Sequence, residues 1–107
     1  MPSPLQQLNY IIPIVSPIGY GITNLGNASQ QVIGANPVRR RLVFWNPNPL
    51  NTIWLCPGAG PATKGGGSVP LFPSSGPYDA TDENVNNAWQ AIADAGTNQG
   101  LTILEFL

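Results

Sequence analysis

The chain has 107 residues, of which only 8% are charged, with four basic side chains, five acidic side chains, no histidine and a net charge of -1. This length suits one domain with one modest core. The small number of basic residues argues against general binding to nucleic acid or to anionic membranes, because both rely on many basic side chains that neutralise phosphates or headgroups. Charged residues usually make up about a quarter of a globular domain, so we expect a partner to cover much of this surface.

Residues 1–30 contain no charged side chain, and four prolines interrupt their apolar positions. We predict an extended arm over this segment that packs on its own domain or on a neighbouring subunit, because an exposed apolar arm would aggregate. The candidate assembly residues of the arm are Tyr10, Ile11, Ile12, Ile14 and Val15. The alternative is that residues 10–15 form the first edge strand of the sheet, where Pro13 would be tolerated. The prolines also break any signal-peptide or membrane-spanning pattern, so we expect synthesis in a cytoplasm and no membrane partner.

Residues 42–45 and 52–55 are rich in branched and aromatic side chains and are too short for typical helices, which indicates two strands. Between them lies a segment of Asn, Pro and Leu that we interpret as a hairpin loop pairing the two strands. A shorter apolar segment, residues 31–34, is expected to pair with the strand that follows Arg39 or with its neighbour. Strand alternation places Leu42 and Phe44 on one face, which we predict to be buried.

Residues 57–68 are rich in glycine and are predicted to be a flexible connection. Residues 69–72 are predicted to be an edge strand or an extended segment, and residues 73–87 a long loop. Residues 88–93 suit either a helix or a strand, and we favour a strand because a turn and a further strand follow them. The last strand covers residues 101–107, and its two faces both carry apolar side chains.

These elements predict an all-β domain, a small β-sandwich or barrel, over residues 31–107, with the extended arm over residues 1–30. The side chains predicted to form the core are Leu42, Phe44, Ile53 and Leu104.

Residues that could carry chemistry are scarce. Cys56 is the single cysteine and has no histidine to activate it, so we predict a buried apolar role at a strand end. The glycine-rich stretch around Lys64 lacks the Gly-Lys-Ser/Thr order of a phosphate-binding loop. The acidic residues Asp79, Asp82 and Glu83 lack calcium-loop spacing. The sequence therefore predicts no catalytic, cofactor or metal site, and no enzyme.

Arg39, Arg40 and Arg41 form the only run of charge. On a strand, alternate side chains point to opposite faces, so the three do not form one basic patch for nucleic acid. We expect one of them to pair with Glu105 or with a loop acid, and we retain all three as candidate contacts with a neighbouring subunit. Three tryptophans, Trp45, Trp54 and Trp89, leave open a sugar-stacking surface, although aromatic residues in strands are more often in a core or an interface.

Four segments of the chain share a pattern of strand and turn residues with a known family: residues 36–47 (NPVRRRLVFWNP), 52–56 (TIWLC), 88–93 (AWQAIA) and 101–105 (LTILE). In this pattern the chain resembles small virion proteins of tailed bacteriophages. Gly66, Gly67 and Ser68 match the family's small-residue segment loosely, and Trp54 stands where tyrosine is more usual. The resemblance spans residues 36–105 and leaves the arm unmatched.

The resemblance implies a β-sandwich or jelly-roll module in a phage particle, with no catalytic residues. We expect a capsid decoration or cement protein, made in the host bacterial cytoplasm and assembled into the virion. It would contact the major capsid protein or other virion proteins and form a homo-oligomer, preferably a trimer. The alternatives are a tail, neck or fibre module, or an adhesin that binds host glycans through Trp54 or Trp89.

Overall fold

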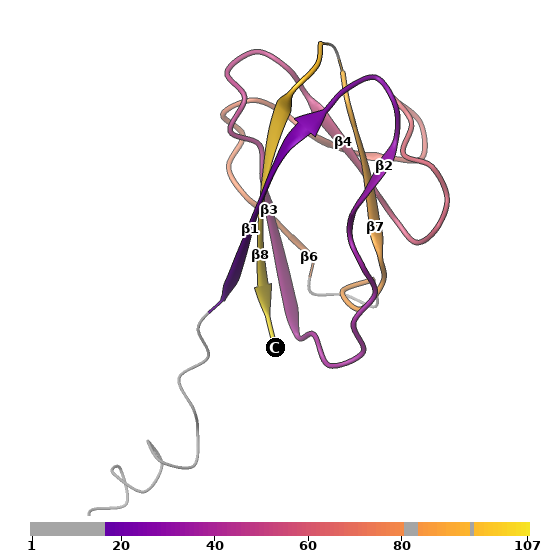
Figure 1. Cartoon of the computed structure of the whole chain (residues 1–107), viewed down its shortest axis with the longest axis vertical. Helices are drawn as coiled ribbons and strands as arrows, with labels where there is room; N and C mark the ends of the chain where they lie inside the picture. Colours follow the sequence, from indigo (N-terminus) through magenta and orange to yellow (C-terminus); the bar gives the residue numbers. More distant parts are fainter. Residues whose placement is uncertain (1–16, 81–83, 95) are drawn as a thin grey trace, which may run out of the picture.

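The computed structural model describes residues 17–80, 84–94 and 96–107. In these ranges the chain forms two four-stranded antiparallel sheets and no helix, which confirms the predicted all-β class (Figure 1). The strands are β1 (Ile18–Leu25), β2 (Gln30–Ile33), β3 (Arg41–Trp45), β4 (Ile53–Pro57), β5 (Val69–Leu71), β6 (Tyr78–Ala80), β7 (Trp89–Ala93) and β8 (Gln99–Phe106).

The two sheets have related strand orders. Sheet A is ordered β1-β8-β3-β6, and sheet B is ordered β2-β7-β4-β5. Of the eight strands in the described ranges, the first therefore pairs with the last, the second with the seventh, the third with the sixth and the fourth with the fifth. As a result, β1 and β6 are the edges of sheet A, while β2 and β5 are the edges of sheet B.

One hydrophobic core lies between the sheets and takes side chains from both of them. Its centre is aromatic: the rings of Phe44 and Trp89 are 5.0 Å apart, and Tyr78 packs beside both at 6.4 and 6.2 Å between ring centroids. These spacings lie in the range in which aromatic pairs attract each other beyond simple burial. The other fully buried large side chains are Leu25, Leu42, Ile53, Leu55, Leu101 and Ile103.

The choice of a strand for the ambiguous segment at residues 88–93 is confirmed, because β7 covers Trp89–Ala93. Trp89, Ala91 and Ala93 are buried on the core face, as strand alternation predicts. The two alanines leave room in this layer for the large Trp89 ring. The predicted edge strand at residues 69–72 is also confirmed, since β5 pairs only with β4.

The predicted hairpin between residues 42–45 and 52–55 is wrong. β3 lies in sheet A and β4 in sheet B, so their connection crosses between the sheets. Asn46 fixes this crossing: its buried side-chain amide donates to the backbone oxygens of Asn51 at 2.8 Å and Leu71 at 2.7 Å, and its Oδ1 accepts from the N–H of Asn48. Asn46 therefore satisfies the backbone groups of the crossing segment, and two prolines prevent the β3 ladder from continuing.

Two further predictions need correction. The predicted arm reached residue 30, but residues 18–25 form β1, which is paired along its length with β8. Residues 31–34 are predicted to pair with the strand after Arg39 or with its neighbour, whereas β2 pairs with β7 in the other sheet and β3 has β8 and β6 as its neighbours. In addition, the predicted loop at residues 73–87 contains the short strand β6. The part of the predicted arm at residues 1–16 lies outside the described residues.

The predicted core holds for Leu42, Phe44 and Ile53 and fails for Leu104. In β8 the buried face carries Leu101, Ile103 and Glu105, while Leu104 is half-buried on the opposite face. A carboxylate on the core side of a strand makes that face look solvent-exposed in the sequence. The structure resolves the conflict by burying Glu105 against Arg39.

Candidate interaction surface

Arg39 belongs to a buried polar cluster in which it is bound to several chain segments. Its Nε donates to Glu105 Oε2 at 2.7 Å, and its Nη1 donates to the backbone oxygens of Val85 and Asn87 at 2.9 and 3.0 Å. Its Nη2 donates to the backbone oxygen of Gly34 at 2.7 Å. A buried ion pair offsets its desolvation only when further hydrogen bonds satisfy both partners, and this cluster supplies them.

Glu105 accepts two further hydrogen bonds, from the Tyr20 hydroxyl at 2.9 Å and from the Asn36 amide at 3.5 Å. Burial alone would raise the pKa of Glu105, but hydrogen bonds from Arg39 and Tyr20, together with the charge of Arg39, hold that pKa below its usual value. The pKa of Tyr20 is raised, chiefly because its hydroxyl donates to the Glu105 carboxylate. The Glu105 carboxyl therefore stays ionised at neutral pH while the Tyr20 hydroxyl stays protonated, and the cluster joins β1, β8 and the residues around Asn36.

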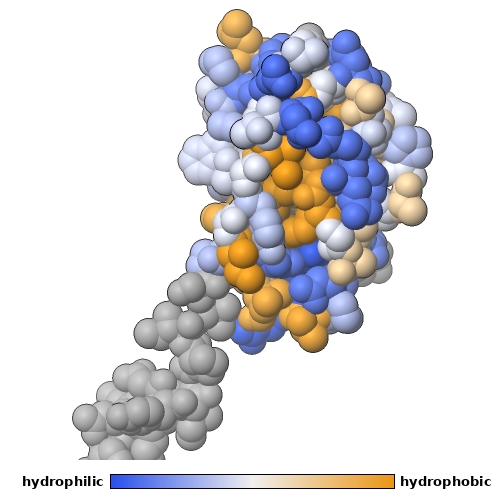
Figure 2. All heavy atoms as spheres, viewed as in Figure 1, coloured by the Kyte–Doolittle hydropathy of each residue, from blue (hydrophilic) through white to orange (hydrophobic). Residues whose placement is uncertain are grey.

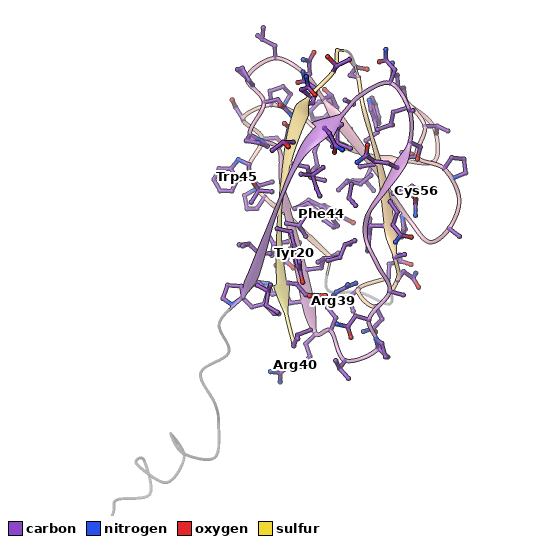
Figure 3. The ribbon with its side chains drawn as sticks, in the orientation of Figure 1. Tyr20, Arg39, Arg40, Phe44, Trp45 and Cys56 are labelled. Carbon is purple, nitrogen blue, oxygen red and sulfur yellow. The ribbon has the colours of Figure 1, made fainter. Side chains whose placement is uncertain are left out.

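The three arginines have different surroundings. Arg39 is buried, and its guanidinium hydrogen bonds lie within the chain, so its side chain is not placed to contact a neighbouring subunit. Arg40 is exposed and donates to the backbone oxygen of Leu107 (Figure 3). Arg41 is also exposed, forms an ion pair with Asp79 at 2.7 Å and lies over the ring of Phe106 at 5.1 Å. The expectation that one arginine pairs with Glu105 or a loop acid is confirmed, and contacts of Arg40 and Arg41 with a subunit stay predictions.

The outer face of sheet A is the clearest candidate interaction surface. We use this name for the side chains of sheet A that point away from the core. They are Arg41, Val43 and Trp45 of β3, Thr102, Leu104 and Phe106 of β8, and Asp79 of β6, with Gly19 and Gly21 of β1 on the same side. Figure 3 shows Trp45 pointing outward from β3 while its neighbour Phe44 points into the core. Trp45 is 52% exposed.

Cross-strand register makes this face continuous. Val43 lies opposite Leu104, and Leu104 lies opposite Gly19. Neither Gly19 nor Gly21 has a side chain that could cover its β8 neighbour, so the flank of Leu104 is open on the β1 side. The only ionic groups in the set, Arg41 and Asp79, neutralise each other at one side of the face. The result is a shallow apolar surface with little net charge, which suits contact with another protein.

The other two tryptophans differ in exposure. Trp89 is buried in the core and donates its indole N–H to the backbone oxygen of Asn84 at 3.2 Å. Trp54 is half-buried, and its indole N–H is 3.4 Å from Asp94 Oδ1. Of the two residues named for glycan binding, only Trp54 therefore reaches the surface.

Few side chains in the described ranges could bind a metal ion, because these ranges hold one cysteine, three carboxylate side chains and no histidine. No three His, Cys, Asp or Glu side chains converge there as a metal site would require. Cys56, predicted to be buried, is half-buried on β4 and unpaired. These residues contain no helix that is long and apolar enough to cross a membrane.

The candidate assembly residues at positions 10–15 lie outside the described residues, so their placement stays a prediction. The outer face of sheet A was not singled out from the sequence. One signal for it was present: both alternating sets of β3 and of β8 contain large apolar side chains, although a sheet with one solvated face normally alternates apolar with polar side chains.

No protein-family model matches the chain, and neither a curated protein nor a solved structure matches it.

Proposed function

We propose that this chain is a structural protein of a tailed-bacteriophage virion, a capsid decoration protein that stabilises the shell through protein–protein contacts. The observation that carries the proposal is the outer face of sheet A, where the exposed Trp45 and the half-buried Leu104 and Phe106 form an apolar surface of low net charge. A monomer that works alone in water seldom leaves such a face uncovered. The motif resemblance of residues 36–105 supplies the virion context.

We further propose that the fold is a jelly roll. Its support is the pairing of the first strand with the last, the second with the seventh, the third with the sixth and the fourth with the fifth. A long hairpin of two four-strand halves, rolled up, produces this pairing and divides the strands between two sheets. Eight-stranded jelly rolls occur in viral capsid domains and also in lectins, so the fold alone does not separate the two functions.

The partners in this proposal are the major capsid protein or another virion protein, together with further copies of the chain, with a trimer preferred. Only nine of 107 residues carry a charged side chain. This scarcity of charge supports a chain whose surface is mostly covered by partner proteins in the particle. The chain would be made in the bacterial cytoplasm and then bind the assembled shell. Attachment to the tail, neck or fibre would use the same apolar face at another place in the particle.

Purified particles of a phage that encodes this chain test the proposal. Quantitative mass spectrometry should find the chain at many copies per particle, and high-resolution imaging should place it on the outside of the shell with sheet A against the capsid. Absence from the particle, or a copy number of about one per vertex or fewer, would contradict the decoration role. Density confined to the tail or neck would support the alternative placement.

The alternative function, binding of host glycans, is now limited to Trp54 among the two tryptophans named for it, because Trp89 is buried. A glycan array with the full chain separates this function from a decoration role. A dose-dependent signal that disappears in Trp54→Ala would favour the adhesin, whereas a decoration protein should give no such signal.

A further inference from the structure

The edge of sheet A at β1 is unusually open for a protein in water. Among the described residues β1 pairs only with β8; it is eight residues long, and its sequence IGYGITNL contains neither a charged residue nor a proline. Proteins commonly protect such edges with charges, prolines or bulges, because alternate backbone groups of an edge strand lack partners. Here a bulge occurs only between Ile22 and Leu25. Within the part of the chain that the structure describes, residues 18–22 therefore present an unprotected edge.

The same part of β1 extends beyond the cover of sheet B. Ile18 and Tyr20 lie directly opposite Glu105 and Ile103, so their side chains are on the core-facing side of sheet A. The two β8 residues are buried, yet Ile18 is 43% exposed and Tyr20 is 38% exposed. Apolar surface that belongs to the core side of the sheet is thus left open.

A cleft lies beside this edge, between β1 and β2. It has a volume of about 320 Å³ and is lined by Tyr20 of β1, by Val32 and Ile33 of β2, by the segment Gly34, Ala35 and Asn36 that follows β2, and by the Arg39–Glu105 pair. Figure 2 shows an apolar strip in this region, between the parts of the surface formed by the two sheets and bordered by hydrophilic side chains. The two charges in the cleft compensate each other, so the cleft suits an uncharged occupant.

We propose that residues 10–15 of a second copy of this chain bind in the β1–β2 cleft as an added strand along β1. The proposal deepens the proposed function and rests on it only in treating the chain as an assembly subunit. Residues 10–15 read YIIPIV, with no charge and with five apolar side chains around one proline. Six extended residues span about 20 Å, and residues 18–22 of β1 span about 17 Å, so the two lengths match.

Pro13 is compatible with this role, because an added strand becomes the new edge of the sheet, where a missing N–H donor is tolerated. The pairing would give the open backbone groups of β1 their partners. The added side chains would cover Ile18, Tyr20 and Ile33. Strand addition of this kind takes its affinity from main-chain hydrogen bonds and its specificity from side-chain pockets.

The residues between residues 10–15 and β1 favour a second copy, rather than the same chain, as the source of the added strand. Only Ser16 and Pro17 separate Val15 from Ile18, so folding back on β1 would require a two-residue hairpin loop. The favoured loops need positive φ at both central residues or at the first. Proline is fixed near −65°, and the remaining loop type would place Ser16 in a conformation suited to glycine. The segment therefore reaches a neighbouring copy more easily than its own β1.

Disulfide trapping between two differently tagged chains tests the proposal. Both chains carry Cys56→Ser; one also carries Ile33→Cys in the cleft, and the other carries Ile11→Cys, Ile12→Cys or Ile14→Cys. After mixing and mild oxidation, the cleft chain should form a mixed disulfide with at least one of the three arm variants. The matched control is Leu50→Cys, which is 86% exposed in the β3–β4 connection and should be linked several-fold less. Equal linking of Ile33→Cys and Leu50→Cys would overturn the proposal.

Two further measurements complete the test. A chain carrying both Ile12→Cys and Ile33→Cys should give linked multimers, and a product linked only within one chain would overturn the role of the second copy. Light scattering should show an oligomer for the full chain and its loss when residues 2–16 are deleted, with an unchanged circular dichroism spectrum. A monomeric full chain would overturn the proposal. All these measurements use the purified chain, so their failure is distinct from absence of the chain from virions.

Discussion

Arg39 and Glu105, 66 positions apart in the sequence, form a buried ion pair with 2.7 Å between Nε and Oε2. The pair joins the residue that precedes β3 to the core side of β8. The carbonyl groups of Gly34, Val85 and Asn87 accept the remaining guanidinium hydrogen bonds. The pair is therefore part of the fold, although the sequence presents Arg39 as one of three adjacent surface charges.

Substitution of Arg39 should be far more costly than the same change at its neighbour. Arg39→Met leaves Glu105 buried without its cation and should lower the free energy of unfolding by about 3–5 kcal/mol. The matched control is Arg40→Met, whose exposed side chain should change that free energy by no more than about 0.5 kcal/mol. Urea unfolding of both variants measures the difference. Similar losses at the two positions would contradict the structural role of Arg39.

The ion pair should also make stability depend on acid pH. The pKa of Glu105 in the folded chain lies below its usual value of about 4.3, so the unfolded chain takes up the proton first as pH falls. The stabilisation is fully present above the usual pKa and is lost as pH drops through the folded-state pKa. Glu105→Gln should therefore be less stable than the original chain at neutral pH, and the two unfolding free energies should converge in acid. A difference that stays constant with pH would contradict this linkage.

The register of β8 predicts that a leucine-to-alanine substitution lowers the free energy of unfolding by different amounts on the two faces of the strand. Leu101→Ala removes a fully buried side chain and should cost about 2–5 kcal/mol. Leu104→Ala, on the outer face of sheet A, should cost less than about 1 kcal/mol. Denaturant unfolding of the two variants checks the assignment. A larger loss at Leu104 would mean that the core lies on the other face of β8.

Local patterns were sufficient to predict the all-β class, the strand at Trp89–Ala93 and the buried face of β3, because alternation and turn residues act over a few positions. The division of β3 and β4 between two sheets was missed, since it depends on Asn46 bonding to Leu71, which is 25 residues away. Leu104 was misplaced for a similar reason. Glu105 can face the core only because Arg39, remote in sequence, neutralises it.

The candidate surface was less accessible to sequence reasoning than the fold. Both faces of β8 carry apolar side chains, so the pattern could not say which face of that strand meets the core and which meets a partner. Strand order and the position of the second sheet decide this, and both depend on long-range pairing. The predicted arm boundary failed because β1 carries glycines and polar residues that are typical of a loop, yet it pairs with β8.

Two truncations separate the part of the N-terminal segment that builds the fold from the part proposed for assembly. Deleting residues 2–16 keeps β1 and should leave a folded chain with a cooperative thermal transition. Deleting residues 2–30 removes β1, including the fully buried Leu25, and exposes the β8 edge of sheet A, so this chain should not fold. Circular dichroism melting compares the two. A cooperative transition in the longer deletion would show that β1 is dispensable.

The most direct test of the account is binding of the purified chain to particles produced without it, because it asks whether the outer face of sheet A is the contact. Trp45→Ala should weaken binding by about 30-fold or more, the effect expected when an interface hot spot of about 2 kcal/mol is lost. The matched control is Phe72→Ala, which removes a ring of almost equal exposure, 53% against 52%, next to β5 at the edge of sheet B. The account predicts that Phe72→Ala binds like the original chain. Binding that is unaffected by Trp45→Ala, or absent for the original chain, would contradict it.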